Sequence, residues 1–157
     1  MAKSNPQGGR KLIARNKKAR RRYEILDTWE AGLALQGTEV KSLRNGQCSL
    51  DEAFARPRNG ELYVVDMHIP PYEQGNRENH EPKRPRKLLL HKREVNNLIA
   101  QINQKGLTLV PLSVYFRNGR AKLELALARG KSFADRREDV RERDAEREVR
   151  QAMRRRR

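Results

Sequence analysis

Apolar positions recur along this chain in two rhythms that predict two kinds of element. In residues 91–106 they follow the i, i+3, i+4, i+7 spacing of an amphipathic helix that ends at Gly106, whereas residues 53–69 and 107–129 alternate apolar and polar side chains as strands do. The helical positions are Val95, Leu98, Ile99 and Ile102. The positions expected to share a strand face are Tyr63, Val65, Met67 and Ile69; Val110, Leu112, Val114 and Phe116; and Leu123, Leu125 and Leu127.

Turn residues divide both alternating segments into hairpins. Asn59-Gly60 and Asn118-Gly119 each stand between two extended runs, and Asn-Gly tolerates the two positive φ angles of a type I′ turn. Residues 23–26, 31–36 and 87–90 predict further strands, the last of them short and buried. Residues 38–46 predict a short helix, with Thr38 as N-cap, Glu39 in the first turn and Gly46 in the left-handed stop.

These elements predict a mainly β fold with six or so short strands. Strand-dominated domains of this size form barrels or sandwiches, and the pattern favours a small barrel without fixing its topology. We expect a flexible basic N-terminus over residues 1–15, the barrel over 16–130, and a C-terminal tail over 131–157 that is disordered when free.

Charge is distributed unevenly over these three segments. The formal charge of +16 divides into +9 for residues 1–22, +3 for 23–130 and +4 for 131–157. Two basic clusters, "NKKARRRYE" at 16–24 and "PKRPRK" at 82–87, are expected at the surface and favour a polyanion partner. With aromatic residues at 5%, recognition of a structured RNA by backbone and shape is favoured over base stacking. Tyr23, Trp29, Tyr72 and Tyr115 could stack on bases, but barrel core is the preferred interpretation.

Catalytic and cofactor chemistry find little support in the sequence. Cys48 is the one cysteine, and His68, His80 and His91 lack metal-ligand spacing, so no metal or other cofactor is expected. Asp27, Glu30 and Glu39 could pair as acid and base, but surface carboxylates are the preferred interpretation. No apolar run approaches the ~18 residues of a membrane helix and no signal peptide is evident, so a cytoplasmic protein that is not an enzyme is expected.

The tail from residue 134 onward contains ten arginines and seven acids and almost no apolar side chains. Such a segment cannot bury enough surface to fold by itself, although its charges could pair along a helix. We interpret it as disordered when free and helical when enclosed by RNA. A solvated charged coil without a role is the alternative.

Four motifs in order resemble the SsrA-binding protein (small protein B) family: "NKKARRRYEI", "EAGLALQGTEVKSLRNG", "RKLLLHKRE" and "LARGKSFADRRED". The resemblance runs from about residue 16 to at least residue 143. It implies a mainly β fold, a small oligonucleotide-binding-type antiparallel β-barrel with two or three flanking helices. It also implies an adaptor that docks on the tRNA-like domain of transfer-messenger RNA and, with elongation factor Tu, brings it to stalled ribosomes for trans-translation. The tail would then lie in the decoding centre and the vacant mRNA channel of the small subunit.

Motif positions and basic side chains together give the candidate site residues. Those for RNA binding are Asn16, Lys17, Arg20, Glu30, Lys41, Arg44, Lys87, Leu89 and Gly130. Those of the ribosome-binding tail are Lys131, Asp135, Arg136, Arg137, Arg141, Arg143 and Met153. The chain departs from the family pattern at Ala134, where an aromatic ring is usual, and whether Phe133 replaces that ring is open.

Two other functions remain in view. A ribosome-associated structural protein or a general RNA chaperone could use the same barrel and would accept many structured RNAs. A nuclease that uses Glu30 and His91 has less support, because no metal-binding cluster accompanies them.

Overall fold

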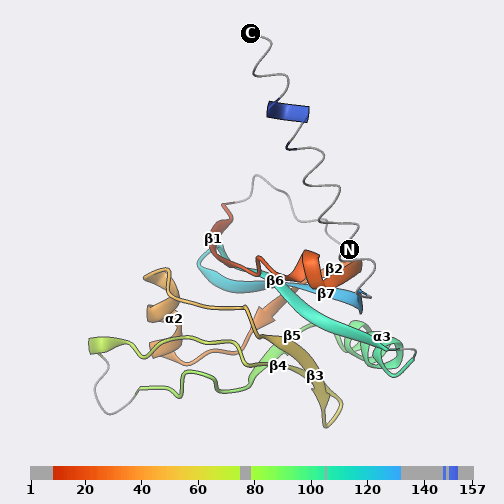
Figure 1. Cartoon of the computed structure of the whole chain (residues 1–157). Coiled ribbons are helices and arrows are strands. Elements are labelled where there is room, and N and C mark those ends of the chain that lie inside the picture. The colour runs from red at the N-terminus through yellow and green to blue at the C-terminus, as the bar shows by residue number, and fades with distance from the viewer. Residues whose placement is uncertain (1–8, 75–78, 105, 132–146, 148, 152–157) are drawn as a thin grey trace.

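The computed structural model describes residues 9–74, 79–104, 106–131, 147 and 149–151. Within residues 9–131 the described chain forms seven antiparallel strands and three helices, and residues 147 and 149–151 are also helical (Figure 1). The strands are β1 (Lys11–Arg15), β2 (Tyr23–Leu33), β3 (Phe54–Arg58), β4 (Glu61–Val65), β5 (Arg86–Leu89), β6 (Leu107–Arg117) and β7 (Arg120–Gly130). The helices are α1 (Ala19–Arg22), α2 (Gly37–Arg44) and α3 (Lys92–Ile102). The prediction of a mainly β, antiparallel fold is confirmed.

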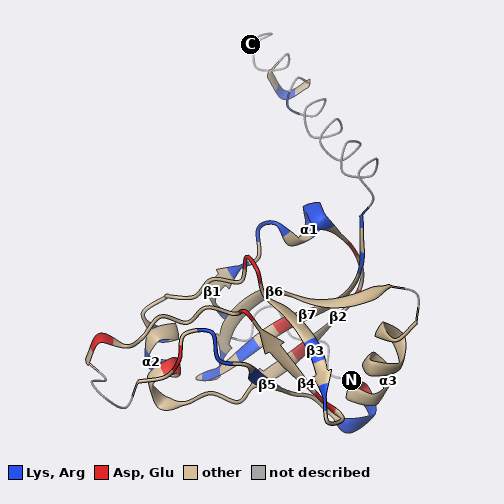
Figure 2. Ribbon diagram, turned by 60° about the horizontal axis from the view of Figure 1, so that its bottom comes forward, with Lys and Arg blue, Asp and Glu red and all other residues tan. Residues whose placement is uncertain are grey.

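The strands close into a barrel because β6 is long enough to serve two neighbours along one edge. The order β6-β3-β4-β5-β2-β7 returns to β6 through the β6–β7 pairing. One half of β6 pairs with β3 at Ala55↔Leu109, and the other half pairs with β1. Helices α2 and α3 lie on opposite sides of the barrel, and α1 lies beside the start of β2 (Figures 1 and 2).

Both Asn-Gly hairpins are confirmed. Asn59 and Asn118 each have φ 51, and the glycines that follow have φ 77 and 75, as a type I′ turn requires. The first turn joins β3 to β4, and the second joins β6 to β7. Gly46 ends α2 with φ 75, which confirms the predicted left-handed stop.

The predicted common face of β6 is wrong because the strand contains a bulge. Leu123, Leu125 and Leu127 of β7 lie in the main core as expected, but the register of β6 shifts between Pro111 and Ser113. A bulge inserts one residue and reverses the direction of the side chains beyond it. The four predicted positions therefore divide between two clusters. Val114 and Phe116 belong to the main core, and Val110 and Leu112 to a small outer cluster with Ala19, Ala126 and Ala128.

A second break in alternation lies at the end of β4. Leu62 and Val64 face the main core, whereas Tyr63 and Val65 belong to neither buried cluster. Asp66 has φ 56, so the chain leaves extended geometry there and resumes with the core residues Met67 and Ile69. The prediction that all four odd-numbered positions from 63 to 69 share a face is therefore correct only for the last two.

Three boundaries also differ from those expected. The two strands predicted within residues 23–36 are one, β2, which reaches Leu33. Lys11–Arg15, assigned to the flexible N-terminus, form β1 on the edge of β6. The N-cap of α2 is Gln36 rather than Thr38: the Gln36 side chain accepts from the N3 backbone, while Glu39 accepts from the Gln36 backbone at 2.8 Å. Thr38 instead contacts His80, 2.9 Å from its Nδ1.

A buried ion pair joins α2 to β5. Glu39 and Arg86, expected at the surface, are both 0% exposed and hydrogen-bond to each other. Arg84 also donates to Glu39, at 2.5 Å. Arg86 further donates to the carbonyls of Met67, at 2.5 Å, and Pro82, at 3.1 Å. Burial acts to raise the pKa of Glu39, but the hydrogen bonds from Arg84, the Gln36 backbone and Arg86 outweigh it and hold the pKa below its ordinary value.

We expect Glu39→Gln to lower the free energy of unfolding by about 3–5 kcal/mol at pH 7, because it leaves the buried Arg86 charge unpaired. Glu24→Gln, which breaks the exposed pair with Arg129, is the matched control and should cost about 1 kcal/mol or less. Urea unfolding measures both. Equal losses in the two variants would show that the buried pair contributes no more than a surface pair.

The same comparison predicts a pH dependence. Because the folded pKa of Glu39 is depressed, its contribution is complete above the unfolded-state pKa of about 4.3 and is lost as pH falls through the folded value. The gap in unfolding free energy between wild type and Glu39→Gln should therefore be constant from pH 7 to pH 5 and shrink below about pH 4. A gap that widens in acid would contradict this assignment.

Candidate nucleic-acid interface

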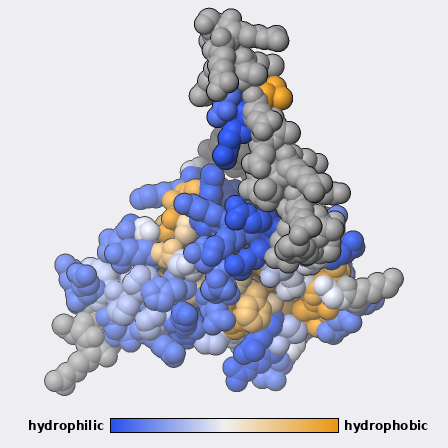
Figure 3. Space-filling model, viewed as in Figure 1, coloured by the Kyte–Doolittle hydropathy of each residue, from blue (hydrophilic) through white to orange (hydrophobic). Residues whose placement is uncertain are grey.

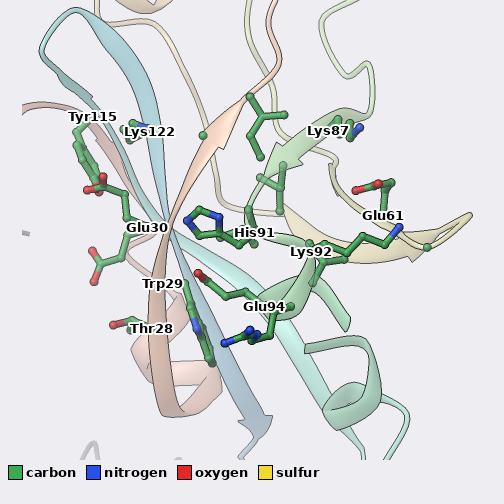
Figure 4. A pocket seen from close by; sticks show the side chains of 18 of the residues that line it. Thr28, Trp29, Glu30, Glu61, Lys87, His91, Lys92, Glu94, Tyr115 and Lys122 are labelled. Carbon is green, nitrogen blue, oxygen red and sulfur yellow. The ribbon is translucent and has the colours of Figure 1, made fainter. Parts of the chain in front are cut away.

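A groove of about 1270 Å³ crosses the outer surface of the barrel between β2, β5, β7 and the start of α3 (Figure 4). Three predicted RNA-binding residues line it: Glu30 from β2, and Lys87 and Leu89 from β5. They lie almost 60 positions apart in the chain and meet because β2 pairs with β5, with Gly32 opposite Leu89. The groove is therefore a product of strand pairing.

Leu89 presents a large apolar side chain to this groove. The β5 strand was expected to be buried, but only its inner face is: Leu88 lies in the core, whereas Leu89 is 50% exposed. A Cβ on the opposing Gly32 would lie 3.1 Å from the Cβ of Leu89. The absence of a side chain at Gly32 thus lets Leu89 lie close over β2.

Glu30 is held at the opposite side of the groove. Its Oε2 accepts from the Tyr115 hydroxyl at 2.5 Å and lies 3.4 Å from Nη1 of Arg117, while its side chain remains 29% exposed. Burial, and then the hydrogen bond and charge of Glu30, raise the pKa of Tyr115 well above its usual range. Tyr115 is therefore a neutral donor at physiological pH. Tyr115 is only 2% exposed, as the core interpretation of this aromatic predicted, although it belongs to neither apolar cluster.

A second group of predicted residues lies around α1. Lys17 and Arg20 are exposed, while Asn16 is tied to the β6 bulge: its backbone donates to Leu112 at 2.8 Å and its amide to Pro111 at 3.0 Å. Gly130 ends β7 beside this helix. Lys131 donates from its backbone to Arg22 at 2.9 Å and from its ammonium to Arg20 at 3.0 Å. The tail thus starts at the basic helix α1 (Figure 2).

A third group lies apart from both. Lys41 and Arg44 are exposed on α2, none of whose residues line the groove. The Lys41 ammonium lies 5.5 Å from the centre of the Tyr72 ring. The structure thus distributes the predicted residues over three surfaces. Six tail candidates lie outside the described residues: Asp135, Arg136, Arg137, Arg141, Arg143 and Met153.

Several groove residues were missed by sequence reasoning as RNA-binding candidates. They are Arg10, His91, Lys92, Arg93 and Lys122, whereas Trp29 and Tyr115, which the sequence offered as possible base-stacking side chains, also line the groove. The cations among them lie outside the two basic clusters, and their convergence depends on long-range pairing. The face of the molecule seen in Figure 3 is largely hydrophilic, with small apolar patches.

Other chemistry has few candidate groups in the described part of the chain. Glu30 and His91 line the same groove, but among the described residues no group of three His, Cys, Asp or Glu could hold a metal ion. Burial raises the pKa of Cys48 to about 12, which keeps its thiol protonated at neutral pH. No helix within the described ranges is long and apolar enough to cross a membrane.

A closed antiparallel barrel with a polar groove on its outer face and a basic helix beside it is an oligonucleotide-binding-type domain. The family model described as SmpB protein matches residues 13–155, and the chain belongs to this family. Its earlier resemblance to SsrA-binding proteins is thereby confirmed.

Individual relatives agree with this assignment. The chain is 59% identical over 144 residues to the SsrA-binding protein of Desulforudis audaxviator, covering 92% of this chain and 94% of the relative. It is 55% identical over 149 residues to that of Geobacillus thermodenitrificans, covering 95% and 96%. A chain of the solved structure described as "tmRNA-SmpB: a journey to the center of the bacterial ribosome" superposes with a TM-score of 0.65 at 54% identity, covering 78% of this chain and 86% of that chain.

We expect Gly32→Ala to weaken binding of a tRNA-like RNA by about fivefold, because the added methyl forces Leu89 out of its place. Gly37→Ala at the start of α2 is the matched control, since its Cβ would meet no atom within 4 Å. Fluorescence anisotropy with labelled RNA measures both. Unchanged affinity in Gly32→Ala would show that RNA binding does not depend on the position of Leu89 over β2.

Proposed function

We propose that this chain is the RNA-binding adaptor of trans-translation. It binds the tRNA-like domain of transfer-messenger RNA and delivers this RNA, with elongation factor Tu, to stalled ribosomes in the cytoplasm. Family membership and the likeness to a chain of a tmRNA-SmpB ribosome structure support this function. The adaptor binds and positions the RNA and performs no chemistry itself, so it needs no cofactor.

The observation that carries the proposal is the convergence of Glu30, Lys87 and Leu89 in one groove. Lys87 attracts phosphate, Leu89 offers apolar contact to a base or ribose, and Glu30 accepts from a 2′-hydroxyl or an exocyclic amine. Such a mixed surface recognises a folded RNA by shape and local hydrogen bonds. A uniformly cationic surface would bind any polyanion.

The α1 surface supplies the electrostatic part of binding. Lys17 and Arg20 are exposed on a segment that contains no acid, and each phosphate they neutralise adds ~0.7–0.9 to the salt slope of binding. The tail begins beside this surface, through the contacts of Lys131 with α1. An RNA held by the barrel would therefore lie at the base of the segment that we assign to the decoding centre and mRNA channel.

The tail as a whole would take up its helical form when it lies inside the ribosome. It alternates arginines and acids up to residue 153 and is close to neutral there, with four further arginines at the end. Coupled folding of such a segment typically costs ~2–5 kcal/mol, which contacts with ribosomal RNA must supply. The tail candidates Asp135, Arg136, Arg137, Arg141, Arg143 and Met153 would contribute these contacts.

Truncation after Lys131 should abolish tagging of stalled peptides while RNA affinity stays within about threefold, because the lost segment is far less cationic than the first 22 residues. Ending the chain at Lys131 keeps the contacts with α1. Reconstituted translation on a messenger without a stop codon measures tagging. A parallel loss of binding and tagging would refute the division between barrel and tail.

The double variant Lys17→Gln, Arg20→Gln, unlike the truncation, should weaken RNA binding itself and lower the salt slope by about 1–2. Fluorescence anisotropy at several salt concentrations measures the slope.

Competition by a tRNA and by an unrelated hairpin measures the specificity of the wild-type protein. An adaptor prefers the tRNA-like domain over the hairpin. A general RNA chaperone, the alternative function, would bind both equally well.

A further inference from the structure

Two carboxylates face each other at one side of the groove. Glu30 on β2 and Glu124 on β7 are direct cross-strand partners, and both line the groove. Like charges at directly opposed positions of a sheet destabilise it. A protein that needs an exposed carboxylate at Glu30 must therefore separate the two acids and hold each of them in place.

Groups from β6 and the N-terminal segment provide this separation. Glu124 accepts from Ser113 at 3.1 Å and pairs with Arg10 at 3.4 Å. Arg10 stacks on the Tyr115 ring, with its guanidinium carbon 3.8 Å from the ring centre. Glu30 is turned toward the hydroxyl end of the same ring and toward Arg117. Each acid thus has its own donors, and Tyr115 contacts both groups: its hydroxyl donates to Glu30, and its ring stacks against Arg10, the partner of Glu124.

The contacts of Glu30 leave one of its oxygens free. Both partners, Tyr115 and Arg117, contact Oε2, and within the described residues no donor is bonded to Oε1. Arg117 is packed into the site, since its Nε and Nη2 are buried without partners in this part of the chain. Figure 4 shows Tyr115 and Glu30 together at one side of the groove, across from Lys87.

We propose that Tyr115 is a positioning residue for RNA recognition: its hydroxyl fixes Oε2 of Glu30 so that Oε1 is presented to a donor on the RNA. This inference rests on the proposed function and adds a residue to its site. A fixed carboxylate loses less side-chain freedom when the RNA binds, so the hydrogen bond that Oε1 accepts contributes more fully to affinity. Tyr115 itself does not contact the RNA.

A double-mutant cycle tests the proposal through the dependence of Tyr115 on Glu30. Tyr115→Phe removes one hydroxyl and keeps the ring under Arg10. We expect it to weaken binding of the tRNA-like RNA by about five- to tenfold in the wild-type background and by less than about twofold in the Glu30→Ala background. The salt slope should not change, because no phosphate contact is lost.

Tyr63→Phe is the matched control. Tyr63 lies half-buried on β4, and within the described residues its hydroxyl makes no hydrogen bond, so its removal should leave RNA affinity within about twofold. Thermal unfolding of every variant separates loss of the contact from loss of the fold. Arg117→Gln provides a second cycle with Glu30→Ala, in which the loss should again be smaller without the carboxylate.

The possible results separate the two proposals. Equal losses from Tyr115→Phe with and without Glu30, or no loss at all, would overturn the positioning role. If the wild-type protein showed no preference for the tRNA-like RNA, the proposed function itself would fail. The proposed function and the positioning role are both supported if the wild-type protein prefers the tRNA-like RNA and the effects of Tyr115→Phe and Arg117→Gln on affinity depend on Glu30.

Discussion

The buried pair between Glu39 and Arg86 is the constraint on which the placement of the groove depends. It fastens α2 to β5 and, through the carbonyls of Met67 and Pro82, gathers the long loop between β4 and β5 around the same guanidinium. A buried charge without a partner would cost several kcal/mol, so these segments must assemble together. Because strands alternate their faces, an inward Arg86 sends Lys87 outward to the groove.

The groove combines features that no single segment supplies. Strand β2 contributes Glu30 and the bare backbone of Gly32, β5 contributes Lys87 and Leu89, and β6 contributes Tyr115. Pairing of β2 with both β5 and β7 brings these strands together. The result is a surface with acid, base, apolar and aromatic groups side by side, which suits the irregular surface of a folded RNA better than that of a uniform duplex.

Two surfaces of the protein, the α1 segment and the groove, differ in their charge. The acid-free segment that contains α1 carries much of the net charge, whereas the groove is mixed in charge. In the proposed function, the first provides attraction without specificity and the second provides discrimination. Contacts from Lys131 bring the base of the tail to α1. An adaptor whose barrel holds an RNA while its tail enters the ribosome needs such a junction, because the junction fixes where the tail leaves the RNA-binding surface.

Local chemistry in the sequence determined the two Asn-Gly hairpins, helix α3, the leucine face of β7 and the stop of α2 at Gly46, since turn geometry and short-range periodicity act within a few residues. The family motifs added the candidate RNA-binding and tail residues, whose roles stay predictions. Only the tertiary structure decided the bulge at Pro111–Ser113, the burial of Glu39 with Arg86, and the meeting of Tyr115 with Glu30. A bulge depends on the partner strand, and a charged side chain is buried only when a distant opposite charge compensates it. Neither condition can be read from neighbouring residues.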